Sequence, residues 1–478
     1  MKHFLRRYSV VLIGLICLGQ THASAAPGPR VRSLRPNILF IFADDLAFDC
    51  VGAYGNNEVA TPNIDRLADR GTMFRRTYNM GGWGGAICVA SRTMLNTGLT
   101  LWRADAARKM LTDKFVAKKQ TWSQMMSAAG YRTYMTGKWH VGAKPTDVFR
   151  TAVNVRGGMP VNHHPDGYNR PQSPNDKHWL PWDTKWGGYW GPGKHMSEIV
   201  ADDAEYFLKD NAYAFHPFFM YIAFNAPHDP RQAPRKFVDR YPQDKVSLPQ
   251  PFLAEHPFDI GSNKIRDEML CPFPRTPFNV KANRGEYYAI ITHMDEQIGR
   301  ILDALDKSGQ AGNTYIFFTA DHGLSVGHHG LVGKQNMYEH SMRVPFIVVG
   351  PDVPKKQVID ARIYMQDVMP TTLDLAGAET PEHVEFNSLL PLIYGETDQS
   401  YKSIYGAYVR FQRMIVRGDH KLIVYPEVER TQLFNLKEDP WETTDLSDDP
   451  NHTDLIAELL KELRALQQQM GDEVRIRS

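Results

Sequence analysis

The sequence predicts an α/β fold in which a sheet, buried on both faces, lies between layers of helices. Apolar runs without alternating polar residues are typical of such strands, and they occur at residues 38–43, 218–224, 315–319 and 346–349. Helical periodicity fills the chain around and between them, at residues 64–70, 122–129, 196–208 and 286–305. This alternation of strands and helices predicts a layered domain.

The pattern changes after about residue 395. Short strand candidates follow at residues 403–409, 413–416 and 421–425, and the last two are joined across Gly418 and Asp419 as a hairpin. A terminal helix is then predicted, with Thr453 as its N-cap and a stripe formed by Leu455, Leu459, Leu463 and Leu466. We therefore expect a main domain at residues 33–394 and a small α+β subdomain at residues 395–478.

Residues 1–25 have the pattern of a secretory signal. Basic residues at positions 2, 6 and 7 precede an apolar run at 10–18, and Ala23-Ser24-Ala25 offers a small-residue cleavage site. The alternative is an N-terminal membrane anchor, but the run is too short to span a bilayer, and no later segment is long and apolar enough to do so. We expect an exported protein, periplasmic or extracellular, without a membrane span.

Charge and cysteine content exclude two classes of protein. The chain of 478 residues has 55 Lys and Arg against 54 Asp and Glu, a formal net charge of +1. A nucleic-acid binder that neutralises phosphates would show a basic excess, so no nucleic-acid partner is expected. Four cysteines are too few for a disulfide scaffold. Cys50 and Cys271 have the option of pairing in an oxidising compartment, and the sequence leaves that open.

One segment is rich in Gly, Pro and aromatic residues. Residues 157–195 hold four of the nine tryptophans, namely Trp179, Trp182, Trp186 and Trp190. Two interpretations are open and about equally favoured. The flat rings present a surface for carbohydrate, or they fasten a long loop to the body of the protein.

Chemically competent residues follow the predicted strands. Asp44-Asp45 and Asp321-His322 end two of them, where open α/β sheets bind ligands. Glycines at 81, 82, 84 and 85 lead into Cys88, and Arg92 lies four residues later on the same helical face. A nucleophile and a cation would then face one anion, although a buried, inert cysteine is the ordinary alternative. His328 and His329, after Gly327, are expected in a loop, where they are solvated or line the site.

The string Cys88-Val89-Ala90-Ser91-Arg92, followed by Thr97-Gly98, resembles the signature of the type I sulfatases of the alkaline phosphatase superfamily. Further segments resemble the family in the same order along the chain, at residues 37–45, 61–68, 137–142, 226–228, 319–323, 330, 334 and 439–442. The resemblance covers essentially the whole chain after residue 25. It implies a large mixed, mostly parallel sheet of the alkaline phosphatase type.

The resemblance also implies the chemistry. Cys88 is expected to be oxidised by a formylglycine-generating maturation enzyme, so that its hydrated aldehyde becomes the nucleophile. One Ca²⁺ ion would be held by Asp44, Asp45, Asp321, His322 and the group made from Cys88. Arg92, Lys138 and Lys334 would stabilise the charge of the transferring group, while His228 protonates the leaving alcohol and His140 takes a proton from the nucleophile.

Two positions depart from the family pattern. Ala90 stands where many members have proline, and His322 stands where many have asparagine. Calcium prefers oxygen ligands, so the histidine leaves another divalent metal possible.

The sequence thus predicts an exported sulfatase acting on a sulfated carbohydrate. One alternative is a phosphomonoester or phosphonate hydrolase of the same superfamily, since one scaffold supports several reactions. The other is a catalytically inactive glycan-binding protein.

Overall fold

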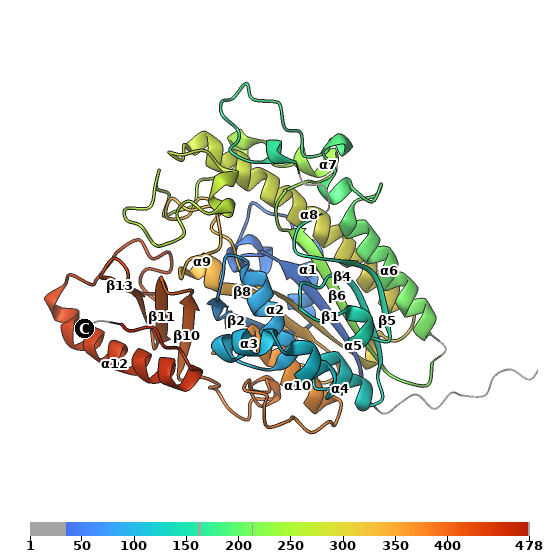
Figure 1. Cartoon of the computed structure of the whole chain (residues 1–478). Coiled ribbons are helices and arrows are strands. Elements are labelled where there is room, and N and C mark those ends of the chain that lie inside the picture. The colour runs from blue at the N-terminus through green and yellow to red at the C-terminus, as the bar shows by residue number, and fades with distance from the viewer. Residues whose placement is uncertain (1–34, 161–163, 213, 477–478) are drawn as a thin grey trace, which may run out of the picture.

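The computed structural model describes residues 35–160, 164–212 and 214–476 (Figure 1). The predicted signal at residues 1–25 lies outside these ranges, so export stays a prediction. Within the described part of the chain, no helix combines the length and the hydrophobicity that crossing a membrane requires.

The main sheet has eight strands in the order β5-β4-β6-β1-β7-β8-β2-β9. Their bounds are β1 (Asn37–Asp44), β2 (Thr72–Tyr78), β4 (Arg132–Lys138), β5 (Thr151–Arg156), β6 (Phe218–Pro227), β7 (Thr314–Ala320), β8 (Arg343–Val349) and β9 (Gln357–Tyr364). Strand β8 is antiparallel to both of its neighbours, and all other pairs are parallel. The predicted mixed, mostly parallel sheet is therefore confirmed.

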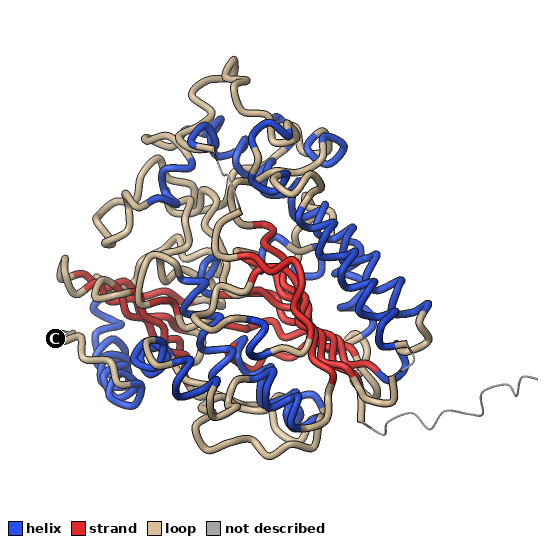
Figure 2. Tube along the Cα trace, turned by 45° about the vertical axis from the view of Figure 1, so that its right-hand side comes forward, coloured by secondary structure: helices blue, strands red, loops and turns tan. Residues whose placement is uncertain are grey.

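Helices cover both faces of this sheet, as Figure 2 shows from the side. The longer helices are α1 (Pro62–Arg70), α2 (Ile87–Thr97), α3 (Leu101–Arg108), α4 (Trp122–Ala128), α6 (Met196–Asn211), α8 (Pro277–Lys307) and α10 (Val368–Leu375), and the short ones are α5 (Pro145–Val148), α7 (Arg235–Val238), α9 (Glu339–Met342) and α11 (Leu390–Ile393). On one face, Trp122 of α4 packs against Phe40, Phe219 and Tyr221. Helices α6 and α8 pack side by side against β6. This double cover explains why every residue of β1 is buried.

A second, five-stranded sheet lies beside the main domain (Figure 1), in the order β13-β12-β11-β10-β3. It consists of β3 (Gly81–Gly82), β10 (Ser403–Tyr408), β11 (Gln412–Arg417), β12 (His420–Tyr425) and β13 (Arg430–Asn435), with α12 (Thr453–Met470) packed on it. Strand β3 comes from the early part of the chain and pairs in parallel with β10. The division at residue 395 stays a prediction. Helix α12 begins at Thr453, so its cap is His452, one residue before the predicted one.

The tryptophan-rich segment is fastened to the body of the protein. Trp179 and Trp186 are buried, and their rings stack at 5.5 Å. The guanidinium of Arg170 lies 4.9 Å from the centre of the Trp179 ring. These contacts favour the loop-fastening interpretation for this pair of rings. Cys50 and Cys271 are both buried and free, so the disulfide that the sequence left open is not formed in this structure.

Candidate active site

The carboxylates of the site meet because two neighbouring strands end together. Strand β1 pairs in parallel with β7, and Ala43 lies opposite Ala320, so Asp44 and Asp321 end up at one edge of the sheet. Asp45 has a positive φ of 67°, which turns the chain sharply after the strand. Its backbone N–H donates to Asp321 Oδ1 at 3.1 Å. Sheet pairing thus brings together residues that are far apart in the sequence.

Helix α2 brings Cys88 and Arg92 to the same edge. Arg92 is fully buried and donates from Nε to Asp321 Oδ2 at 3.0 Å and from a terminal nitrogen to the Lys138 carbonyl oxygen at 2.7 Å. Ser91 donates to the Asp321 carbonyl oxygen at 2.8 Å, which fixes the helix against the end of β7. The Cys88 Sγ atom lies 3.3 Å from Nδ1 of His140. Cys88 and Arg92, one helical turn apart, therefore both face the site, as their spacing predicted.

Two buried lysines neutralise the aspartates. Lys138, at the end of β4, donates from Nζ to Asp44. Lys334 donates from Nζ to both carboxylate oxygens of Asp45 at 2.8 Å. Burial alone would lower the pKa of each lysine, but the neighbouring carboxylates outweigh it and hold both pKa values above the usual range. Both lysines therefore stay charged at neutral pH.

His322 provides the test of whether these residues fit a metal ion. Its Nδ1 lies 2.9 Å from the Gly323 carbonyl oxygen, which only accepts, so Nδ1 carries the proton. Its Nε2 faces Asp45 Oδ1 at 3.1 Å and Asp321 Oδ1 at 3.6 Å, and it is buried without a hydrogen-bond partner among the described residues. A cation between this nitrogen and the two carboxylates would give all three groups a partner. The site therefore fits a cation.

The donor set supports the same conclusion. Ligand atoms of Asp44, Cys88, Asp321 and His322 all lie within 4.8 Å of one another, and so do those of Asp44, Asp45 and His228. Three carboxylates with one imidazole suit a divalent metal. The expectation that His322 belongs to the metal group agrees with this geometry, while the identity of the ion is a matter for proposal.

His228 follows β6 and lies on the other side of Asp45. Its Nδ1 is 2.8 Å from the Asp229 carbonyl oxygen and its Nε2 is 3.8 Å from Asp45 Oδ2. The Tyr189 hydroxyl is 3.0 Å from the His228 carbonyl oxygen and steadies this turn. Burial and the nearby Lys334 charge lower the pKa of His228 well below its usual value, so the ring is neutral.

His140 follows β4 and has a positive φ of 53°. Burial, together with the charge of Lys138, lowers the pKa of its imidazole to about 4. At neutral pH the ring is therefore free to accept a proton beside Cys88. Gly158 packs directly against the ring and leaves no room for a side chain at that position.

A cavity of about 400 Å³ opens above Cys88. Among the predicted residues, Cys88, His140, His228 and Lys334 line it. Asp44, Asp45, Arg92, Lys138, Asp321 and His322 do not line this cavity, and all are buried. The structure thus brings all ten predicted site residues together.

Sequence reasoning missed a second group of lining residues, Met159, Ile265, Arg266, Asp267 and Gln335. Arg266 forms an ion pair with Asp229 at 2.6 Å, and Asp267 lies 3.9 Å from the Lys334 Nζ. In the sequence, the signal for this group was Asp229, because it directly follows the predicted site residue His228. His328 and His329 are both buried, and neither lines this cavity, so the expectation of solvated or site-lining loop histidines was wrong.

Comparison with known proteins agrees with this geometry. The family model "Sulfatase" matches residues 36–378, and the model "N-sulphoglucosamine sulphohydrolase, C-terminal" matches residues 327–469. The chain is 28% identical to an arylsulfatase of Clostridium perfringens over 90% of this chain and 93% of the relative. It is 27% identical to an N-acetylglucosamine-6-O-sulfatase of Bacteroides thetaiotaomicron over 97% and 91%, respectively.

Two solved structures have the same fold. A protein crystallised with its substrate D-glucosamine-2-N,6-O-disulfate superposes with a TM-score of 0.70 at 24% identity, covering 92% of this chain and 99% of that one. The phosphonate monoester hydrolase of Agrobacterium radiobacter superposes with a TM-score of 0.71 at 20% identity, covering 91% and 96%. The fold is thus shared by enzymes with different reactions, whereas the family models match the sulfatases. This chain belongs to the sulfatase family of the alkaline phosphatase superfamily, and it is a sulfuric ester hydrolase.

Proposed function

We propose that this protein is an exported sulfatase that removes sulfate from a sulfated carbohydrate, using a formylglycine made from Cys88 and one bound divalent metal ion. The observation that carries the proposal is the position of Cys88. Its sulfur lies at the floor of a cavity, beside a neutral histidine and within 4.8 Å of ligand atoms of Asp44, Asp321 and His322.

Two groups absent from the encoded chain complete this chemistry. Formylglycine at position 88 would supply the hydroxyl nucleophile, for which the Cys88 sulfur stands here. Asp44, Asp45, Asp321 and His322 would hold a divalent ion, which would supply a Lewis acid for the sulfate oxygens. We propose Ca²⁺ because three of these four ligands are carboxylates, and the nitrogen of His322 leaves room for another divalent ion.

Fixed cations receive the sulfate group. Arg92 and Lys138 hold Asp321 and Asp44 in place by hydrogen bonds. Lys334 lines the cavity itself, where its ammonium group would face a bound anion. Charges fixed in a water-poor site stabilise a transition state more than they would in water, because they need not reorganise during the reaction. The charge that shifts to the leaving oxygen of the bound ester therefore develops close to these cations.

Two histidines divide the proton transfers between them. His228 lines the cavity on the side of Asp45 and Lys334. Its ring is neutral in the free site, and we propose that it takes up a second proton when the anionic ester binds and passes that proton to the oxygen of the departing alcohol. His140, beside residue 88, accepts the proton from that residue when sulfate is released. The low pKa of His140 suits it to this role, since the ring is unprotonated at neutral pH.

Carbohydrate is the substrate class that the observations favour. The cavity volume is within the range of small-molecule sites, and its lining includes Arg266, Asp267 and Gln335, polar groups that suit sugar hydroxyls. Relatives named for glucosamine sulfates support the same class. The secretory-signal pattern of residues 1–25 supports export of the protein. Outside the cell it would meet sulfated carbohydrate polymers.

The experiment has two readouts on protein purified from its native host. The mass of the peptide containing residue 88 is expected to show an aldehyde in place of the thiol. Sulfate release from an aryl sulfate and from sulfated glucosamine is expected to fall below detection in Cys88→Ala. Cys271→Ala is the matched control, since Cys271 is also buried and free but does not line the cavity.

Either readout is able to overturn the proposal. An unmodified thiol in a fully active enzyme would exclude formylglycine, and equal activity in wild type and Cys88→Ala would exclude the mechanism. Faster hydrolysis of the matched aryl phosphate or phosphonate than of the aryl sulfate would favour the other reactions of the superfamily.

A further inference from the structure

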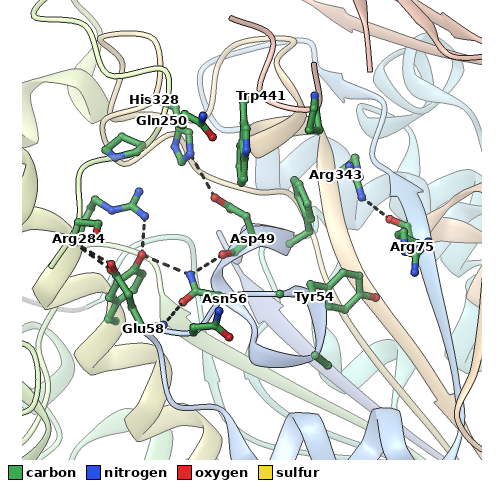
Figure 3. A pocket seen from close by; sticks show the side chains of 18 of the residues that line it. Asp49, Tyr54, Asn56, Glu58, Arg75, Gln250, Arg284, His328, Arg343 and Trp441 are labelled. Carbon is green, nitrogen blue, oxygen red and sulfur yellow. Dashed lines mark hydrogen bonds and ion pairs between the residues drawn. The ribbon is translucent and has the colours of Figure 1, made fainter. Parts of the chain in front are cut away.

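A second pocket has a volume of about 750 Å³ (Figure 3). Its walls come from residues 48–58 after β1, from α8, and from residues 436–441 beyond β13. None of its lining residues also lines the Cys88 cavity. His328 also lines the pocket, and its Nε2 lies 3.3 Å from Asp49 Oδ2. Pockets between domains are common ligand sites, and this volume suits a small molecule.

The lining of this pocket carries an excess of positive charge. It contains two acidic residues, Asp49 and Glu58, and four arginines, Arg75, Arg76, Arg284 and Arg343. Three of the arginines have carboxylate partners outside the lining, in Asp360, Asp419 and Glu339. The fourth, Arg284, is different.

Arg284 is a buried cation without a direct carboxylate contact among the described residues. The residue is 6% exposed. Asp49 and Glu58 act on its charge from beyond ion-pair distance. Its terminal nitrogens donate to the neutral Tyr288 hydroxyl at 2.5 Å and the Val326 carbonyl oxygen at 3.4 Å, and Nε has no partner in the described chain. In Figure 3 the guanidinium extends from α8 into the pocket. A buried guanidinium is costly unless an anion pairs with it, and it binds sulfate-like and carboxylate groups through paired N–H donors.

The remaining lining residues suit a sugar. Trp441 is half-buried, and its ring is nearly parallel to the His328 imidazole at 6.0 Å. Asn57 and Gln250 are exposed amides on the same lining. Aromatic faces with planar polar groups beside them are complementary to a pyranose ring and its hydroxyls.

We propose that this pocket is an accessory binding site for an anionic saccharide unit, with Arg284 pairing with its sulfate or carboxylate group and Trp441 contacting the sugar ring. The inference rests on the proposed function, because a polymer with many charged units offers one unit to the reaction cavity and others to the surface around it. The accessory site holds a unit that is not hydrolysed.

The test uses the full chain carrying Cys88→Ala, which binds without turnover. The probe is a 6-O-sulfated disaccharide that contains a uronic acid, compared with a neutral disaccharide of the same ring structure. Calorimetric titration measures affinity and stoichiometry at low ionic strength, where paired charges are least screened. Asn57→Trp fills the pocket from an exposed position, and Arg284→Gln removes the cation. Asn451→Trp, also at an exposed asparagine but away from the pocket, is the matched control.

We expect the affinity of the accessory pocket for the charged disaccharide to fall at least tenfold in Asn57→Trp and in Arg284→Gln. In Asn451→Trp the same affinity is expected to stay unchanged. The neutral disaccharide is expected to bind at least tenfold more weakly than the charged one. Should Arg284→Gln fail to fold, Asn57→Trp carries the test, because the substituted side chain lies at the surface. Binding that is identical in all three variants would overturn the inference, and so would equal affinity for the neutral probe.

Failure of the proposed function would look different. If wild type does not release sulfate but Asn57→Trp still abolishes binding of the charged probe, the pocket stands and the reaction does not. If wild type releases sulfate and the pocket variants bind normally, the reaction stands and the pocket inference falls.

Discussion

The imidazole of His140 rests directly on the backbone of Gly158. A β-carbon at position 158 would come within 2.4 Å of Cε1 of the ring and 2.6 Å of Nε2, distances that force the ring to move. Residue 158 lies in the segment that follows β5, so the position of the His140 ring, the proposed proton acceptor, depends on a loop far from Cys88 in the sequence.

Gly158→Ala is therefore expected to lower kcat by about 10- to 100-fold, since a displacement of about 1 Å at a catalytic group has effects of that size. The melting temperature should change little, because residue 158 is half-buried in a loop. Steady-state kinetics on an aryl sulfate is the measurement. Gly157→Ala is the matched control, since a β-carbon there meets nothing within 4 Å. Equal kcat in both variants would contradict a packing role for Gly158.

Metal binding is expected to stabilise the folded protein. Asp44, Asp45 and Asp321 lie together in the interior, and an ion bound only by the native state adds about 2.7 kcal/mol at a concentration of 100 times its Kd. Chelation should lower the melting temperature and added Ca²⁺ should restore it. Asp44→Asn should lose this response, whereas Asp360→Asn, at an exposed aspartate, should keep it. A melting temperature indifferent to chelation in wild type would exclude a metal at these residues.

Asp295 makes stability depend on pH. Its carboxylate accepts the Ile64 N–H at 2.8 Å at the start of α1, and burial raises its pKa from 3.8 to about 6. Because the folded pKa is the higher one, this group's contribution to stability is fully present below about pH 4 and is lost as the pH rises to 6. Between pH 4 and 7, Asp295→Asn should therefore gain roughly 3 kcal/mol of unfolding free energy relative to wild type.

The measurement is urea unfolding at several pH values. Asp303→Asn, at an exposed aspartate of the same helix, is the control and should follow the wild-type pH dependence. Parallel stability curves for wild type and Asp295→Asn would show that the buried carboxyl does not titrate in this range.

Lys421 links the second sheet to the main domain. It is fully buried on β12, and its Nζ lies 3.0 Å from Glu339 of α9 and 2.8 Å from Glu442. Lys421→Met would leave two buried carboxylates without this partner and should cost about 3–5 kcal/mol of unfolding free energy.

Adding Glu442→Gln to Lys421→Met should recover part of that loss, because one of the buried negative charges is removed. Lys437→Met, at an exposed lysine, should be nearly neutral in the same chemical unfolding experiment. A double variant no more stable than Lys421→Met would argue against a charge effect.

Strand prediction succeeded where burial on both faces left a continuous apolar run, as in β1, β6 and β7. It failed for β2, where Arg75 and Arg76 interrupt the run, and for β4, whose sequence includes Arg132, Thr133 and Lys138. These strands owe their place to hydrogen bonds with neighbours distant in the sequence, which a local pattern does not contain.

The site residues were predicted in two ways. Strand ends and a helix start pointed to six of them, namely Asp44, Asp45, Cys88, Arg92, Asp321 and His322. The other four, Lys138, His140, His228 and Lys334, were expected only from the family resemblance. Arg266 and Asp267 lie in a loop, and only the fold brings them to Cys88. His329 looked like a solvated loop residue, but its ring stacks on Tyr338 at 3.9 Å, a contact that no spacing rule anticipates.

The pairing of β3 with β10 has a consequence for the order of events during synthesis. Gly81 and Gly82, just before the helix that carries Cys88, pair with Ala407 and Tyr408. Until a ribosome has made the chain through residue 408, this stretch lacks its partner strand. In the folded protein Cys88 is only 2% exposed. We therefore expect the proposed conversion of this thiol to be easier before the fold is complete than after it.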